Sequence, residues 1–227
     1  MKFRLSSTVV FSSVIGYLLG TDYFSFTDIS YLIIGGIFVT GSANAFNQIV
    51  EKNYDKLMER TGQRPLPLKR LSSFQAIIFA ILIGIFGLFV LYHVSPGGYK
   101  SCFFALLSVL LYVLVYTPLK RISPIAIFVG AFPGAIPILL GWVAATNDFG
   151  LAAGILFAVQ FCWQFPHFIA ISWVLDEEYK KAGFKMIYGG EKGKYPASVA
   201  LLTSIMMTII SVLPYFLKIE FISLSIF

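Results

Sequence analysis

The sequence contains few charged residues. Asp, Glu, Lys and Arg make up 12% of its 227 residues, whereas soluble domains contain about 25%. Hydrophobic residues make up 58%, above the about 45–50% that is usual in soluble domains. Such a chain has too few polar side chains to cover a globule in water. This excludes an ordinary soluble domain and indicates a protein surrounded mostly by lipid.

Cysteine is also scarce, and the start of the chain lacks a cleavable signal. Cys102 and Cys162 both lie in apolar runs, which excludes a disulfide framework and a cysteine metal motif. We interpret both as small core residues. Lys2 and Arg4 precede an apolar stretch, but no clear small-residue cleavage site comes before Thr21. This pattern predicts a retained first helix rather than a removed signal peptide.

Seven apolar segments are each near the roughly 20 residues that a helix needs to cross a bilayer. Gly and Pro inside them are tolerated better in membrane helices than in soluble ones. The sequence therefore predicts an all-α fold, a polytopic transmembrane helical bundle of about seven helices in one domain over 1–227. We expect the helices near 5–21, 28–50, 74–94, 101–118, 122–145, 150–175 and 197–217.

Basic residues gather on one predicted side of the membrane. All except Lys100 and Lys218 fall at the N-terminus or in the connections 51–73, 120–121 and 176–196. By the positive-inside rule this side is cytoplasmic, so we expect a multi-pass protein of a bacterial inner membrane with its N-terminus and these loops in the cytoplasm. The net charge of +6 is then a topology signal. It does not indicate nucleic-acid binding, because no basic face alternates with stacking aromatics.

The first polar cluster follows the second apolar segment. Asn47, Glu51 and Asp55 are spaced by four residues, so on a continuing helix they share one face. Their side-chain oxygens suit Mg²⁺, which takes one or two carboxylates together with water and substrate phosphates.

Arg60 and Arg64 come next, before a stiff Pro-rich turn at 65–67. Arginine forks match phosphate oxygens in a bidentate way. Metal-binding carboxylates beside arginines predict a diphosphate site. The alternative is a solvated, helix-capping charged loop.

The second polar cluster repeats this theme after the sixth apolar segment. Asp176, Glu177 and Glu178 precede Lys180 and Lys181. Two acidic clusters on one face of the membrane could bind two Mg²⁺ ions bridged by one diphosphate.

Gln164 and His167 lie inside the sixth apolar segment. Ionisable groups at membrane depth indicate function. His167 is therefore interpreted either as a neutral histidine bonded across helices or as a contact to a polar or metal-bearing substrate.

These regions resemble a known family. "NQIVEKNYDKLMERTGQRPLP" (47–67) and "WQFPHFIAISWVLDEEYKKAGFKM" (163–186) are similar to the two signature regions of the UbiA-type membrane prenyltransferases. "QFPHF" and "EEYKKAG" resemble the branch of that family that farnesylates heme, as do "YTPLKR" (116–121) and "FVGAFPGAIPILLGW" (128–142). The resemblance spans nearly the whole chain.

The resemblance implies an enzyme and a set of site residues. Asn47, Glu51 and Asp55 would form the first metal–diphosphate motif, and Glu177 and Glu178 the second, with Mg²⁺ as cofactor. Basic partners of the diphosphate and contacts of the acceptor are implied at further positions: Arg60, Arg64, Lys120 and Arg121 for the diphosphate, and His167 and Gln164 for heme.

The implied substrates are farnesyl diphosphate and heme b. The 2-vinyl group of heme b accepts the farnesyl chain, and water completes the hydroxyethylfarnesyl group of heme O. A downstream heme-modifying enzyme or a terminal oxidase assembly is an implied partner.

The chain also departs from the family pattern. The family has nine transmembrane helices, whereas seven are expected here, and Asp176 stands where the family often has a basic residue. We therefore expect a chain shortened at its C-terminus, and the short first helix raises the same question for the N-terminus.

Two other functions stay open at this point. A UbiA-type enzyme that prenylates an aromatic quinone precursor would have a second motif richer in aspartate and would lack "PHF". A transporter would also use helices broken by Pro and Gly such as 128–142, but acidic clusters confined to one side favour an enzyme.

Overall fold

The computed structural model describes residues 3–21, 23, 25–219 and 221, and over these residues it contains helices and no strand. The predicted all-α class is confirmed. Each predicted apolar segment is helical, and the helices are α1 (Phe3–Gly20), α2 (Phe26–Asp55), α4 (Ser73–Tyr92), α5 (Gly98–Leu110) with its continuation, α7 (Ala126–Thr146), α8 (Leu151–Val174) and α10 (Lys194–Phe216).

Six helical spans among the described residues are long and apolar enough to cross a membrane, and α1 contributes a shorter apolar stretch, Leu5–Gly20. The continuation of α5 is unusual, because the helix widens into a π-helical turn, η1 (Leu111–Tyr116), before the short α6 (Thr117–Leu119). Two further short helices, α3 (Glu59–Gly62) and α9 (Asp176–Lys181), lie in the charged connections.

Local sequence signals explain where several helices begin and end. The Ser25 side chain accepts a hydrogen bond from the backbone N–H of Asp28 at the start of α2. Ser72 and Gln75 form a reciprocal capping box at the start of α4, which satisfies two backbone N–H groups that the first turn leaves unpaired. Asn147 ends α7 in the left-handed conformation (φ 52°), which asparagine adopts more readily than most residues.

Small residues let the helices pack closely. A Cβ atom added at Gly87 of α4 would lie 2.8 Å from the backbone nitrogen of Val39 on α2. Close backbone approach at glycine is a common way for helices to associate in lipid. Large apolar side chains point outward on the faces that no other helix covers, as Leu82 and Phe89 do on α4 and Ile209 does on α10. This distribution is typical of a helix bundle with an apolar exterior.

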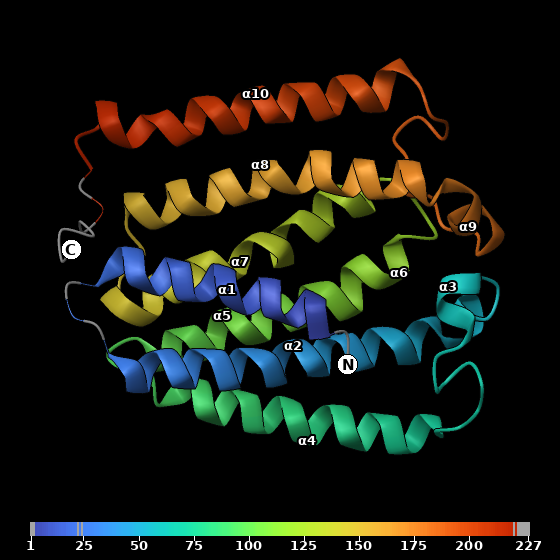
Figure 1. The fold of residues 1–227 in the computed structure, drawn as a ribbon, viewed down its shortest axis with the longest axis horizontal. Helices are drawn as coiled ribbons and strands as arrows, with labels where there is room; N and C mark the ends of the chain where they lie inside the picture. Colours follow the sequence, from blue (N-terminus) through green and yellow to red (C-terminus); the bar gives the residue numbers. More distant parts are fainter. Residues whose placement is uncertain (1–2, 22, 24, 220, 222–227) are drawn as a thin grey trace.

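The charged connections meet at one end of the bundle. Figure 1 shows α3, α9 and the connection after α6 at the same end of the long axis. The Glu59 backbone N–H donates to Glu178 Oε2 (2.8 Å), and the Lys185 N–H donates to the Lys120 carbonyl (2.7 Å). The predicted gathering of the loops 51–73, 120–121 and 176–196 on one side is confirmed, whereas Lys2 lies outside the described residues.

Candidate functional site

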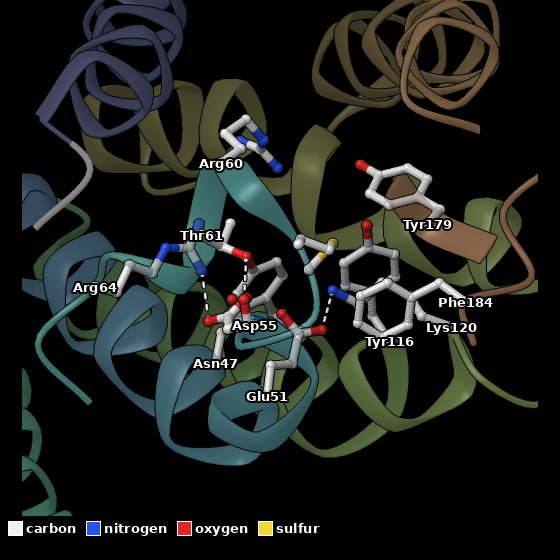
Figure 2. A pocket seen from close by; sticks show the side chains of 12 residues that line it. Asn47, Glu51, Asp55, Arg60, Thr61, Arg64, Tyr116, Lys120, Tyr179 and Phe184 are labelled. Carbon is white, nitrogen blue, oxygen red and sulfur yellow. Dashed lines mark hydrogen bonds and ion pairs between the residues drawn. The ribbon is translucent and has the colours of Figure 1, made fainter. Parts of the chain in front are cut away.

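The last turns of α2 carry the first polar cluster into a pocket. Asn47, Glu51 and Asp55 are 1%, 5% and 1% exposed, although all three are polar. Their spacing of four residues places them on one helix face, as predicted. They line a cavity of about 110 Å³ together with the basic side chains of Arg60, Arg64 and Lys120 (Figure 2).

Asp55 lies where α2 ends, and the chain turns back over it. Arg64 Nη1 donates to Asp55 Oδ2 (2.7 Å), and Thr61 Oγ1 donates to the Asp55 carbonyl (3.0 Å). The second carboxylate oxygen, Oδ1, is buried and has no hydrogen-bond donor in the described structure. A buried acceptor without a donor is costly unless a ligand satisfies it.

Lys120 reaches the pocket from the connection after α6. Its ammonium group forms an ion pair with Glu51. It also lies 5.0 Å from the ring centre of Tyr116 and 5.1 Å from that of Phe184. Aromatic faces attract cations, so these rings and the carboxylate hold the lysine at the edge of the pocket.

A second and larger cavity adjoins the charged one. It measures about 940 Å³ and is lined mostly by apolar residues of α1, α2, α5, α7 and α8. Four residues line both cavities and form their shared wall: Arg60, Tyr112, Tyr116 and Tyr179. The Tyr112 and Tyr116 rings are stacked with their centres 5.4 Å apart. A charged chamber therefore borders an apolar one across a wall of tyrosines.

Gln164 and His167 line the larger cavity and not the charged pocket. Gln164 Nε2 donates to the Gly134 carbonyl (3.4 Å). The His167 ring stacks on Trp163 with centroids 4.6 Å apart. Polar groups inside an apolar cavity orient a ligand rather than drive its burial.

Glu177 and Glu178 of the second acidic cluster lie at the rim and not inside the pocket, whereas Asp176 is buried outside the pocket lining and pairs with Lys180 (2.9 Å). Glu177 is exposed. Glu178 uses one oxygen for the Glu59 N–H and the other for Lys181 Nζ (3.0 Å). The hydrogen bond from Lys181 holds the pKa of Glu178 below its usual value. The structure therefore does not bring Glu177 and Glu178 together with Asn47, Glu51 and Asp55.

Arg121 contacts a tyrosine outside the pocket lining. Its guanidinium hydrogen-bonds the Tyr54 hydroxyl and lies 4.0 Å from the centre of that ring. Of the four basic residues predicted to bind diphosphate, the structure places Arg60, Arg64 and Lys120 in the pocket lining and leaves Arg121 outside it.

Sequence reasoning missed several residues that line the pocket. Tyr179 follows the acids of α9 directly, and Gly183 (φ 71°) reverses the chain so that Phe184 comes back beside it. Burial raises the pKa of Tyr179, so its hydroxyl stays protonated. The position of Tyr179 between the acids and the lysines of "DEEYKK" (176–181) is a sequence signal that could have identified it as a pocket residue. The remaining missed residues come from segments that read as plain apolar helix or as turn: Met58, Thr61, Tyr112 and Tyr116.

The donor set fits Mg²⁺ shared with a phosphate. The described residues contain no group of three or more His, Cys, Asp or Glu side chains that could hold a metal alone. Glu51 and Asp55 supply two carboxylates, Asn47 an amide, and Asp55 Oδ1 lacks a donor. Mg²⁺ is usually held by one or two carboxylates and completed by substrate phosphates and water.

Comparison with known proteins identifies related sequences. The sequence model of the UbiA prenyltransferase family matches residues 9–227. The chain is 50% identical to a protoheme IX farnesyltransferase of Flavobacterium psychrophilum, covering 95% of this chain and 72% of the relative. It is 47% identical to a protein of the same name from Christiangramia forsetii, covering 95% and 71%.

Solved structures share the fold. A UbiA homolog from Archaeoglobus fulgidus, bound to DMAPP and Mg²⁺, superposes with a TM-score of 0.76 at 18% identity, covering 98% of this chain and 79% of the other. A structure described as digeranylgeranylglyceryl phosphate synthase gives the same TM-score at 22% identity, covering 95% and 75%. These similarities confirm the predicted type of helical bundle.

Proposed function

Because this chain belongs to the UbiA prenyltransferase family, we propose that it transfers a farnesyl group from farnesyl diphosphate to the vinyl group of heme b and so makes heme O. Relatives named protoheme IX farnesyltransferase, at 46–50% identity over most of the chain, support this substrate pair. We also propose that residues 1–227 form one transmembrane prenyltransferase domain.

One observation carries the proposal: a charged pocket of about 110 Å³ shares a wall with an apolar cavity of about 940 Å³. Farnesyl diphosphate has a compact anionic head and a long apolar tail. The head suits the pocket that holds three basic side chains, and the tail suits the cavity. The bond that breaks then lies at the tyrosine wall between them.

The pocket residues would hold the diphosphate and its metal. Arg60, Arg64 and Lys120 donate to phosphate oxygens, with the arginine forks matching them in pairs. Asn47, Glu51 and Asp55 would hold Mg²⁺. When bound, Mg²⁺ supplies positive charge that stabilises the departing diphosphate. Arg64 is paired with Asp55, and Lys120 with Glu51. When the diphosphate and Mg²⁺ bind, the two basic side chains would pair with phosphate oxygens and the two carboxylates with the metal.

Glu177 and Glu178 are proposed to act from the rim as a second metal motif. Glu178 binds the backbone of Glu59, the residue before Arg60. The contact links α9 to the loop that carries the pocket arginines. Taking up a metal would require Glu178 to release Lys181. Arg121 would join the diphosphate only by leaving the ring of Tyr54.

The tyrosine wall would stabilise the allylic cation. Loss of diphosphate leaves positive charge on the farnesyl carbon at the wall, and aromatic faces stabilise such charge. Tyr112 and Tyr116 present stacked rings there. The mostly apolar lining disfavours water, which would otherwise capture the cation before the vinyl group does. One water molecule then adds to the alkylated vinyl group, with loss of a proton, to give the hydroxyl group of heme O.

Heme b is proposed to bind in the larger cavity. Its volume is near the upper end of the range of about 300–1,000 Å³ found for small-molecule sites. His167 and Gln164 lie on one lining helix, α8, and would orient the porphyrin. In the proposed orientation the charged end of the bundle faces the cytoplasm of a bacterial inner membrane, where the positive-inside rule places it.

Purified protein in lipid vesicles, supplied with labelled farnesyl diphosphate, Mg²⁺ and heme b, tests the proposal. We expect label in heme O and none without Mg²⁺. Label in an aromatic acid offered as a quinone precursor, with heme b unmodified, would contradict the heme assignment and favour the alternative acceptor.

A further inference from the structure

Thr117 connects the first polar cluster to the π-helical turn. It is buried at the junction of η1 and α6. Asn47 Nδ2 donates to Thr117 Oγ1 (3.1 Å), and Thr117 Oγ1 donates to the Tyr112 carbonyl (2.7 Å). The Thr117 hydroxyl therefore connects Asn47, a predicted metal ligand on α2, to the backbone of η1.

These two hydrogen bonds fix a direction. A hydroxyl group has one proton, and Thr117 gives it to the Tyr112 carbonyl. Toward Asn47 the hydroxyl can then only accept, so the amide must turn its nitrogen to Thr117. The oxygen and nitrogen ends of an asparagine amide have nearly the same shape. Because the Thr117 hydroxyl proton is already donated to the Tyr112 carbonyl, only the amide orientation with Nδ2 toward Thr117 forms a hydrogen bond.

The π-helical turn supplies the acceptor for that proton. Thr117 donates both its backbone N–H and its hydroxyl to the Tyr112 carbonyl, five residues back. In an α-helix a threonine hydroxyl reaches the carbonyl three or four residues back instead. The wide turn therefore sets where the Thr117 hydroxyl lies, and π-turns are frequent at functional sites.

We propose that Thr117 is a positioning residue that orients the Asn47 amide so that Oδ1 faces the pocket as a ligand for Mg²⁺. The reversed amide would turn an NH₂ group, which binds no cation, toward Glu51 and Asp55. This inference rests on the proposed function, because it assigns Thr117 to the metal site of that reaction. Partners that orient metal ligands typically change metal affinity by about 10–100-fold when removed.

Mn²⁺ binding in the presence of a non-reactive farnesyl thiodiphosphate, followed by electron paramagnetic resonance, provides a readout separate from turnover. Thr117→Val removes the hydroxyl at almost constant volume. We expect Thr117→Val to weaken Mn²⁺ binding about tenfold or more. Thr117→Ser keeps the hydroxyl group, so we expect it to bind Mn²⁺ as tightly as the native chain. Thr117→Ala serves the same comparison if the valine variant does not fold. The matched control is Thr203→Val on α10, whose hydroxyl bonds only backbone carbonyls.

A double-mutant cycle separates orientation from a structural contact. Asn47→Asp replaces the amide by a carboxylate with two equivalent oxygens, so its orientation no longer matters. We expect Thr117→Val to change Mn²⁺ affinity much less in the Asn47→Asp background than in the native one. Equal losses in both backgrounds would overturn the proposed orientation.

The Asp55→Ala variant distinguishes a wrong assignment of Thr117 from a wrong assignment of the metal site itself. Loss of Mn²⁺ binding in Asp55→Ala with native binding in Thr117→Val would overturn the Thr117 assignment alone. Native Mn²⁺ binding in Asp55→Ala would instead overturn the metal site on which the proposed function depends.

Discussion

The acidic residues of α2 and those of α9 look alike in sequence but occupy different environments. "EKNYDK" (51–56) and "DEEYKK" (176–181) both mix acids, lysines and a tyrosine. Glu51 and Asp55 are buried and face the pocket, whereas Glu177 is exposed and the Glu178 side chain is 21% exposed. The acids of α2 are four residues apart and share a face, while Glu177 and Glu178 are adjacent and cannot. Spacing therefore lets Glu51 and Asp55 reach the pocket together, whereas in α9 the acid Asp176 is buried outside the pocket lining.

The largest effect is expected at Asp55. Asp55→Ala removes a predicted metal ligand and leaves Arg64 without its 2.7 Å partner. We expect heme O formation to fall by at least about 100-fold. Initial rates measured in vesicles with equal amounts of inserted protein check this. A rate close to that of the native chain would show that the buried α2 acids are not the metal site.

A smaller loss is expected at Lys120. Lys120→Met removes one phosphate partner and leaves Glu51 unpaired in the pocket. We expect the KM for farnesyl diphosphate to rise about 10- to 150-fold, as one lost charged hydrogen bond of about 1.5–3 kcal/mol implies. Arg121→Met should raise it less, because Arg121 lies on Tyr54. The control is Lys185→Met, because the Lys185 side chain is exposed and the hydrogen bond to the Lys120 carbonyl comes from the Lys185 backbone N–H. An equal rise for Arg121→Met would contradict the placement of the two basic residues.

The smallest effect is expected at the rim. Glu178→Gln keeps an oxygen for the Glu59 N–H and loses only the charge, so we expect a reduction of severalfold, below that of Asp55→Ala. A loss as large as that of Asp55→Ala would show that the proposed second metal motif contributes as much to turnover as the buried acids of α2.

The pH dependence of the rim contact follows from the lowered pKa of Glu178. A carboxylate with a lowered pKa stabilises the folded state above its usual pKa, and this stabilisation is lost as pH falls through the lowered value. The α9–α3 contact should therefore be constant near neutral pH and weaken only in acid. Amide hydrogen exchange at Glu59, measured between pH 7 and pH 3, checks this. Faster loss of protection already near pH 6 would contradict it.

The seven helices could be predicted because each apolar run is long and bounded by charge or by turn residues. The shared helix face of Asn47, Glu51 and Asp55 on α2 could be predicted because a four-residue spacing is enough to define a helix face. The direction of the α9 acids could not be predicted, since the orientation of this six-residue helix depends on tertiary contacts such as that of Glu178 with the Glu59 N–H. The tyrosine wall was also missed, because Tyr112 and Tyr116 sit in an apolar run whose π-helical turn has no sequence signal that we recognise.

A structure of the protein in lipid with Mg²⁺ and farnesyl thiodiphosphate tests the central claim most directly. We predict that the diphosphate lies among Arg60, Arg64 and Lys120, with metal against Asn47 and Asp55, and that the farnesyl chain passes the tyrosine wall into the larger cavity. A diphosphate bound outside this pocket, or a farnesyl chain that leaves in another direction, would contradict the account.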